Sequence, residues 1–151
     1  MMILYAHRGN LNGKNVDLEN NPDYIEHALK SGFSVEIDVH YTDNKFYLGH
    51  DEPLYEIDES YLENSKLICH AKTSESFMMM LKNRYIHTFW NSKDLYAITS
   101  EDFLWSLDSE KGIVDNPKLI LCDVEFRGFM ITKWHYDKFY GICSDYVGEI
   151  K

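Results

Sequence analysis

The sequence has few of the features that mark secreted, disulfide-rich or multi-domain proteins. Its 151 residues include only three cysteines, three prolines and eight glycines. Cys69, Cys122 and Cys143 are odd in number and lie in apolar runs, which favours buried thiols over a disulfide framework or a zinc site. No linker rich in Gly, Ser or Pro and no repeat of fixed period divides the chain. We therefore expect a single domain over residues 1–151.

Basic runs and long apolar stretches are also missing. Asp and Glu number 25 against 15 Lys and Arg, a formal net charge of −10, which argues against general nucleic-acid binding. No apolar stretch approaches the roughly 18–20 residues that span a bilayer, and residues 1–9 lack the basic and apolar regions of a signal peptide. We therefore expect a cytoplasmic protein without stable membrane insertion.

Short strands with little helix between them are predicted along most of the chain. Two helices are expected: residues 22–31, with Asn21 as N-cap and Pro22 at the first helical position, and residues 74–83, capped by Thr73. Strands are predicted at residues 2–6, 33–39, 45–49, 66–71, 86–90, 95–99, 103–107, 118–124 and 140–144. The order strand, helix, strand at the start favours a parallel first pair.

Glu36 and Asp38 share one face of the strand predicted at residues 33–39, because side chains alternate along a strand. Two carboxylates on one face of an otherwise apolar strand repel each other and lose solvation. A hard divalent cation is the usual compensation. The same pattern also arises where a strand face is simply exposed to water, and the sequence leaves both interpretations open.

Histidines and basic residues stand at the ends of several predicted strands. His7 and Arg8 follow the first strand, His50 follows a short strand, and His70 and Lys72 share one face where residues 66–71 end. In parallel sheets, functional sites are built at such strand ends. An imidazole transfers protons near neutral pH, and an arginine or lysine binds phosphate. A lone histidine is more often structural, so the recurrence at successive strand ends is what indicates a site.

Six motifs follow one another in the first third of the chain: His7-Arg8-Gly9, Glu19-Asn20, Gly32, Glu36-Ile37-Asp38-Val39, Thr42-Asp43 and His50-Asp51. Their order and spacing resemble the amino-terminal signature of the glycerophosphodiester phosphodiesterase family, of the phospholipase C-like phosphodiesterase superfamily. Residues 69–72 and 141–145 resemble later strand ends of that family more weakly.

The resemblance implies a fold and a set of site residues. The fold is a compact or truncated (β/α)8 TIM-type barrel with most later helices missing, because 151 residues fall well short of the roughly 250 that such a barrel usually takes. The implied acid and base are His7 and His50, the implied phosphate ligands are Arg8 and Lys72, and Glu19 would support the first-strand loop.

The resemblance also implies a divalent metal, Mg²⁺ or Ca²⁺, held by Glu36 and Asp38. The family has a third carboxylate ligand where this chain has His70, and an imidazole there would favour Mn²⁺ or similar ions. Either His70 or an oxygen from Glu125 or Asp123 would complete the set.

The activity implied is that of a phosphoric diester hydrolase, a metal-dependent enzyme that cleaves a small or lipid-derived, glycerophosphodiester-like substrate. Three alternatives stay open: a phospholipase-like lyase that forms a cyclic phosphate, a non-catalytic module that binds a phosphate ligand, and a fold whose site binds nothing. Because few helices are left to cover the sheet, we also expect a second copy of the chain to cover its open flank as a homo-oligomer.

Overall fold

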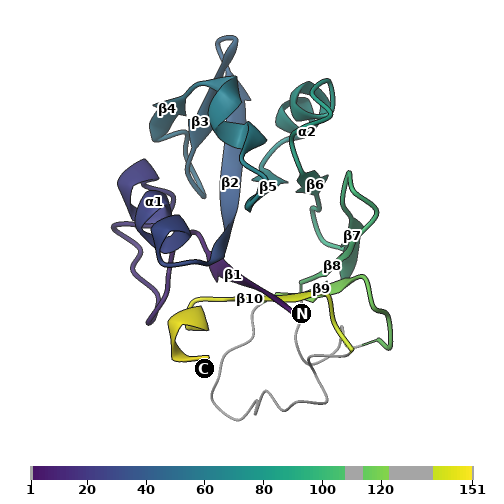
Figure 1. Cartoon of the computed structure of the whole chain (residues 1–151). Coiled ribbons are helices and arrows are strands. Elements are labelled where there is room, and N and C mark those ends of the chain that lie inside the picture. Colours follow the sequence, from purple (N-terminus) through teal and green to yellow (C-terminus); the bar gives the residue numbers. More distant parts are fainter. Residues whose placement is uncertain (1, 108–113, 123–137, 151) are drawn as a thin grey trace.

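One curled mixed sheet forms the body of the computed structural model, which describes residues 2–107, 114–122 and 138–150 (Figure 1). Its strands are β1 (Ile3–His7), β2 (Ser34–Thr42), β3 (Lys45–Leu48), β4 (Tyr55–Ile57), β5 (Leu67–Ala71), β6 (Thr88–Trp90), β7 (Tyr96–Ile98), β8 (Leu104–Ser106), β9 (Leu119–Leu121) and β10 (Gly141–Ser144). The helices are α1 (Pro22–Lys30) and α2 (Ser74–Met80), with 3-10 turns η1 (Glu59–Glu63) and η2 (Val147–Glu149).

β2 is the longest strand and joins two parts of the sheet. It pairs in parallel with β1 and with β5, and its last residues pair antiparallel with β3, which in turn pairs with β4. From β1 the sheet continues through parallel β10, β9 and β8, and β8 pairs antiparallel with β7. β1 and β10 therefore lie side by side although they come from opposite ends of the chain (Figure 1).

The expected compact or truncated (β/α)8 TIM-type barrel is wrong. The sheet is a mixed half-barrel in which β3, β4 and β7 pair antiparallel with their neighbours, and the described residues contain only two α-helices. One reason is the tight turn after β2, where Asp43 and Asn44 have φ angles of 51° and 61°. Such a turn returns the chain antiparallel, whereas a parallel neighbour needs a long crossover.

Both predicted helices and the parallel first pair are confirmed. The side chain of Asn21 accepts a hydrogen bond from the backbone N–H of Asp23, and Pro22 occupies the first turn of α1. The side chain of Thr73 accepts one from the backbone N–H of Ser76 at the start of α2. The predicted strands are found within a few residues of their expected bounds, although residues 123–124 lie outside the described part of the chain. β4 and η1 were not predicted.

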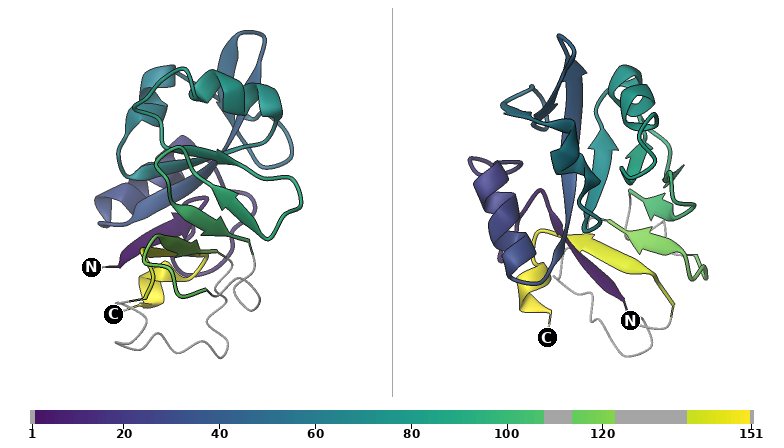
Figure 2. Two further views of the ribbon diagram at one scale, coloured as in Figure 1. Left: turned by 90° about the vertical axis from the view of Figure 1, so that its right-hand side faces the viewer. Right: turned by 45° about the horizontal axis from the view of Figure 1, so that its top comes forward.

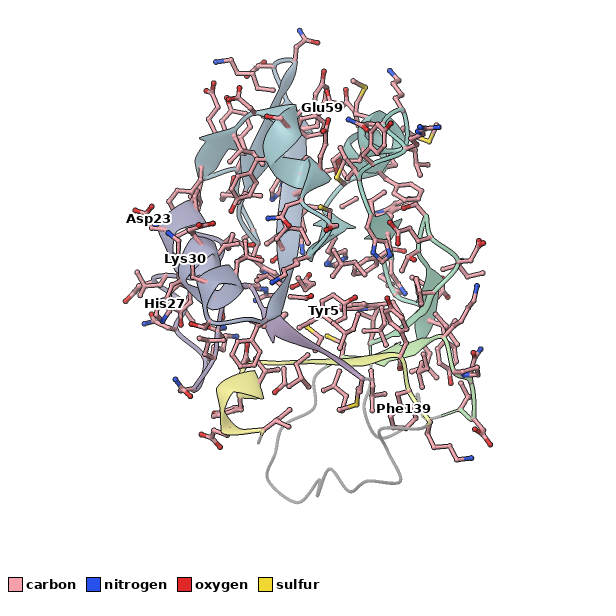
Figure 3. All side chains as sticks on the ribbon, viewed as in Figure 1. Tyr5, Asp23, His27, Lys30, Glu59 and Phe139 are labelled. Atoms are coloured by element: carbon pink, nitrogen blue, oxygen red, sulfur yellow. The ribbon has the colours of Figure 1, made fainter. Side chains whose placement is uncertain are left out.

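The convex face of the sheet carries one apolar layer. Val35, Ile37 and Val39 of β2 are fully buried and pack with Ile25 of α1 and Met80 of α2 in one cluster. α1 lies against β2, and α2 lies against β2, β5 and β6 (Figure 2). The polar residues Asp23, His27 and Lys30 of α1 project away from the sheet (Figure 3).

A second apolar cluster fills the concave face. It includes Tyr5 of β1, Ile68 of β5, Phe89 of β6, Trp105 of β8 and Ile120 of β9. Side chains from so many strands meet only inside the curl, where Figure 3 shows Tyr5. Because side chains alternate, Glu36 and Asp38 share this inner face, opposite the residues that pack on the helices.

The three cysteines are buried, as the sequence predicted. Burial raises the pKa of the Cys69 thiol, so this sulfur stays protonated and inert. Across the described segments of the chain, the helices are too short and too polar to cross a membrane.

Candidate functional site

The carboxyl ends of β1, β5 and β10 and the middle of β2 bring most of the predicted site residues together. The strand register places Glu36 directly opposite His7 and Asp38 directly opposite His70. Arg8 and Lys72 are the residues that directly follow β1 and β5. The parallel pairing of these strands is what gathers side chains that are far apart in the sequence.

Glu36 and Asp38 are almost completely shielded from water, with exposed fractions of 2% and 0%. The alternative interpretation, in which this face of the strand is exposed to solvent, is therefore wrong. Two buried carboxylates need cations or hydrogen-bond donors nearby. The two side chains meet this need in different ways.

Asp38 is surrounded by positive charge and by donors. Its Oδ2 lies 2.9 Å from Arg8 Nε and accepts a hydrogen bond of 2.9 Å from Asn20 Nδ2. Its Oδ1 lies 3.2 Å from Lys72 Nζ and 3.3 Å from His70 Nδ1. Burial alone would raise the pKa of Asp38, but His70, Arg8 and Lys72 outweigh it and hold the pKa well below its usual range. Asp38 is therefore an anion.

Glu36 is buried with much weaker compensation. Its Oε2 has no hydrogen-bond partner among the described residues, and His7 Nε2 lies 3.8 Å away. Its Oε1 lies 3.8 Å from His70 Nδ1. Burial and the neighbouring charge of Asp38 raise the pKa of Glu36. A carboxylate in this position lacks a close cation.

Glu36, Asp38 and His70 can each offer one ligand atom, and these atoms all lie within 4.8 Å of one another. The orphaned oxygen of Glu36 and this donor set fit a divalent metal ion. Two carboxylates with one imidazole suit Mg²⁺ less well than Mn²⁺ and suit Ca²⁺ least, because Ca²⁺ takes six to eight oxygen ligands. The structure brings His70 to the place of the third ligand, whereas Glu125 and Asp123 lie outside the described residues.

His7 is oriented by Asp145, which directly follows β10 and contacts the Nδ1 side of the imidazole ring. His7 Nδ1 lies 2.9 Å from Asp145 Oδ1, and Asn10 Nδ2 donates to the same oxygen at 2.8 Å. Burial lowers the pKa of His7, but the hydrogen bond to Asp145 and the charge of Glu36 outweigh it and raise the pKa to about 10. His7 is therefore a cation in this structure.

Glu19 links the loop after β1 to the site. Its Oε2 accepts a hydrogen bond of 3.0 Å from Arg8 Nη1, and its Oε1 accepts one of 3.0 Å from Asn10 Nδ2. Arg8 thus lies between two carboxylates, Glu19 and Asp38, and their charges raise the pKa of its guanidinium against the opposing effect of burial. These contacts fix the plane of the Arg8 side chain.

His50 stands apart from the strand ends, on the loop after β3. It lines a cavity of about 370 Å³ together with Arg8, Glu19 and Asn20. Its Nδ1 lies 2.7 Å from Asp51 Oδ1. Burial and the charges of Arg8 and Lys72 lower the pKa of His50, against the effect of Asp38, so its imidazole is neutral at neutral pH. The two predicted catalytic histidines therefore differ in charge.

Three polar residues of the site were given no role from the sequence: Asn10, Asn20 and Asp145. Asn10 directly follows the His-Arg-Gly motif, and Asn20 is the second residue of the Glu-Asn motif. The Asn20 side chain holds Asp38 twice: Nδ2 donates to Asp38 Oδ2, and Oδ1 accepts from the backbone N–H of Asp38. The Asn20 backbone has a φ of 62°, and its N–H donates to the backbone oxygen of Arg8. Asp145 ends the last strand, and its strand-end position was the signal available in the sequence.

Formal charges within the site nearly cancel. When every carboxyl group is counted as an anion and only His7 among the histidines is counted as a cation, three formal cations face four carboxylates, a balance of −1. The cations are His7, Arg8 and Lys72, and the carboxylates are Glu19, Glu36, Asp38 and Asp145. A divalent cation would change the balance to +1, which matches the single negative charge of a phosphodiester.

Comparisons with protein-family models, with curated proteins and with solved structures find no match to this chain. The resemblance of its first third to the glycerophosphodiester phosphodiesterases therefore rests on the sequence motifs alone. The function has to be argued from the geometry of the site.

Proposed function

We propose that this chain is a metal-dependent phosphodiesterase that hydrolyses a small or lipid-derived phosphodiester. The observation that carries the proposal is the orphaned buried oxygen of Glu36 next to a site with two fixed cations, Arg8 and Lys72, and two histidines, His7 and His50. In a phosphodiester the alkoxide is a poor leaving group, and the negative charge of the phosphate repels an attacking nucleophile. Its cleavage therefore needs a cation, an electrostatic clamp and two proton-transfer groups.

Glu36, Asp38 and His70 would hold the metal, Mg²⁺ or Mn²⁺. When bound, a divalent cation polarises a phosphoryl oxygen and stabilises the charge that develops in the transition state. Its charge would also offset the mutual repulsion of the two buried carboxylates, which is the unfavourable feature of this pair of side chains.

Arg8 and Lys72 would bind the phosphate oxygens. Arg8 already uses Nε toward Asp38 and Nη1 toward Glu19, so its guanidinium is oriented before a ligand arrives. The same side chain lines the cavity that His50 shares. A preoriented guanidinium loses little conformational entropy on binding, which favours the transition state as well as the substrate.

His7 and His50 would supply the two proton transfers. Each imidazole has its Nδ1 on a carboxylate, Asp145 for His7 and Asp51 for His50. This leaves Nε2 of each ring for the reaction. One imidazole would take the proton of the attacking water, and the other would protonate the leaving alkoxide.

Phosphorus NMR of the reaction with a glycerophosphodiester tests the proposal in Mg²⁺, Mn²⁺ and Ca²⁺. We expect a phosphomonoester product, and we expect His50→Ala to lower kcat by about 10² to 10⁴ because a proton-transfer group is lost. His27→Ala is the matched control, since His27 is an exposed histidine on α1. It should leave the rate unchanged.

Other outcomes of this assay support the alternatives. A cyclic phosphate as the final product would indicate a lyase instead of a hydrolase. Binding of the metal and the phosphodiester without turnover in any of the three metals would contradict the enzyme and support a binding module. The expected cytoplasmic location and homo-oligomer stay predictions, and light scattering over a range of concentrations tests the second.

A further inference from the structure

We infer that the substrate carries a single apolar chain, which lies in a cleft beside the candidate site. The inference rests on the proposed function for the phosphodiester itself, and it adds the chemical class of the alcohol that the phosphodiester contains. The cleft is the cavity of about 370 Å³ that His50 and Arg8 share. We call it the loop cleft, because the loop after β1 and the loop after β3 form its walls.

The loop cleft has a buried polar floor and an exposed apolar mouth. Asn20 lies at the floor with no exposed surface, beside the Arg8 guanidinium. Val16 and Leu54 line the same cavity but are 70% and 62% exposed, so they lie at its mouth. A phosphodiester bound by Arg8 would therefore extend one of its ester groups outward past Val16 and Leu54.

Val16 and Leu54 belong to none of the apolar clusters that the described residues form around the sheet. They come from different loops, and Leu18 of the first loop is also 40% exposed. Large apolar side chains exposed on both sides of a cleft next to a polar site are typical of a surface that a ligand covers. A sugar or a charged alcohol would gain little from them, whereas an alkyl chain would remove them from water.

The remaining lining and the size of the cleft limit the chain to one. Lys14 lies on one wall, and Asp51 and Glu52 lie on the other, so the sides of the cleft remain hydrated. A volume of about 370 Å³ is at the low end of the roughly 300–1,000 Å³ of small-molecule sites. This leaves room for one alkyl or acyl chain, and we expect single-chain phosphodiesters to bind better than two-chain phospholipids.

A series of methyl-n-alkylphosphinates, from ethyl to octyl, tests the inference by binding alone. These anions carry the single charge of a phosphodiester but have no P–O–C bond that the protein could cleave. We expect the affinity of the Mn²⁺-loaded protein, measured by calorimetry, to rise by about two- to fourfold per methylene over the first carbons, where fourfold corresponds to full burial. The double variant Val16→Ser, Leu54→Ser should lose most of this rise.

Ile98→Ser is the matched control, because Ile98 is 71% exposed but lies on β7, outside the loop cleft. It should keep the full dependence on chain length. An equal affinity for all members of the series, no binding of any member, or an equal rise in the double variant would overturn the inference. Equal thermal unfolding of the two serine variants would show that folding is not the cause of a difference.

The NMR assay with a glycerophosphodiester separates this inference from the proposed function. Binding that strengthens with chain length but no turnover would contradict the enzyme and leave the chain-binding cleft in place. Turnover of the phosphodiester with equal affinity across the phosphinates would keep the enzyme and exclude the apolar chain.

Discussion

Gly49 determines where the catalytic candidate His50 can lie. Its φ is 152°, and a Cβ on this residue would clash with the backbone carbonyl oxygen of Glu52. Its N–H donates to the backbone oxygen of Asp38, a proposed metal ligand, at 3.2 Å. This single residue therefore ties the loop that carries His50 to the strand that carries the carboxylates.

Gly49→Ala is expected to lower the free energy of unfolding by about 1–3 kcal/mol, because backbone must move to make room for the methyl group. It should also lower kcat/KM for the phosphodiester by about tenfold or more, since small displacements of a catalytic group have large effects. Urea denaturation and the phosphorus NMR assay measure the two effects.

Gly32→Ala is the control for backbone strain without a clash. Gly32 has a φ of 95°, but a Cβ on this residue would meet no heavy atom of the described chain within 4 Å. We expect a loss of about 1 kcal/mol and full activity. Equal activity of the two alanine variants would contradict the role of Gly49 in placing His50.

At the residue scale, the charged residues of the site were easier to predict from the sequence than the residues that contact and orient them. Glu36, Asp38, His70 and Lys72 were predictable because alternation along a strand puts every second residue on one face. Asn10 and Asp145 were not assigned, because their contact at 2.8 Å joins residues 135 positions apart. No local pattern reports such a pairing.

At the scale of elements, Thr73 joins the end of β5 to the start of α2. Its side chain accepts from the backbone N–H of Ser76, and the Ser76 hydroxyl accepts from the backbone N–H of Thr73. Lys72, which contacts Asp38, directly precedes this capping box. The cap therefore also fixes the backbone that carries a site residue.

Thr73→Ala should destabilise the fold by about 1 kcal/mol, the usual effect of losing an N-cap. Thr73→Ser keeps the hydroxyl and should differ from the wild type by only a few tenths of a kcal/mol. Thermal unfolding of the two variants measures the difference. Equal stability of Thr73→Ala and Thr73→Ser would show that the capping bond contributes nothing.

His87 connects β6 to the residues around β7 and makes this junction sensitive to acid. Its Nε2 lies 2.8 Å from Thr99 Oγ1, and its Nδ1 lies 3.7 Å from Glu101 Oε2. Thr99 Oγ1 also accepts from the backbone N–H groups of Glu101 and Phe103, which occupy both acceptor positions and leave its hydroxyl hydrogen for the ring. Burial lowers the pKa of His87 against the opposing charge of Glu101, so the folded state favours the neutral ring.

A lowered pKa makes the stability fall with acid. Above pH 6.5 the His87 ring is neutral in the folded and in the unfolded chain. As the pH falls below 6.5, the unfolded chain binds a proton before the folded chain does, so the free energy of unfolding decreases as the pH approaches the pKa of the folded state. We expect the urea midpoint of the wild type to drop more between pH 7.5 and pH 5.5 than that of His87→Gln. An equal drop would mean that His87 does not titrate differently in the two states.

The path of the sheet was less predictable than its strands. The antiparallel return of the chain after β2 depends on the backbone angles of Asp43 and Asn44, which the pattern of apolar residues does not report. The expected barrel came from the resemblance to the glycerophosphodiester phosphodiesterases, which covers only the first third of the chain. Between β7 and β8, residues 99–103 are too few for a crossover, so these two strands pair antiparallel.

At the scale of the whole molecule, metal binding should be coupled to folding. The proposed ligands come from two neighbouring strands, β2 and β5, and their atoms come within 4.8 Å of one another in the fold. An ion that binds only the folded chain stabilises it by about 2.7 kcal/mol at a free concentration of 100 times its Kd. For a chain of this length, we expect Mn²⁺ to raise Tm by about 5–11 °C.

Glu36→Gln should abolish most of this rise in Tm, since it removes the anion with the fewest partners. Glu56→Gln is the control, because Glu56 is an exposed acid that pairs with Lys45 on the β3–β4 hairpin. Calorimetric scans with and without Mn²⁺ measure the shift. A shift of equal size in Glu36→Gln would exclude this metal site.

The contact between His7 and Asp145 joins residues separated by 138 positions. At about 5–20 residues per second, the ribosome adds the second of these residues roughly 7–28 s after the first. During most of that interval the nascent chain contains Glu36, Asp38 and His70, but it lacks Asp145, the carboxylate that contacts His7 Nδ1. The proposed acid–base residue His7 is therefore the last part of the site to acquire its partner, and a stalled or shortened translation product would contain the proposed metal ligands without Asp145 beside His7.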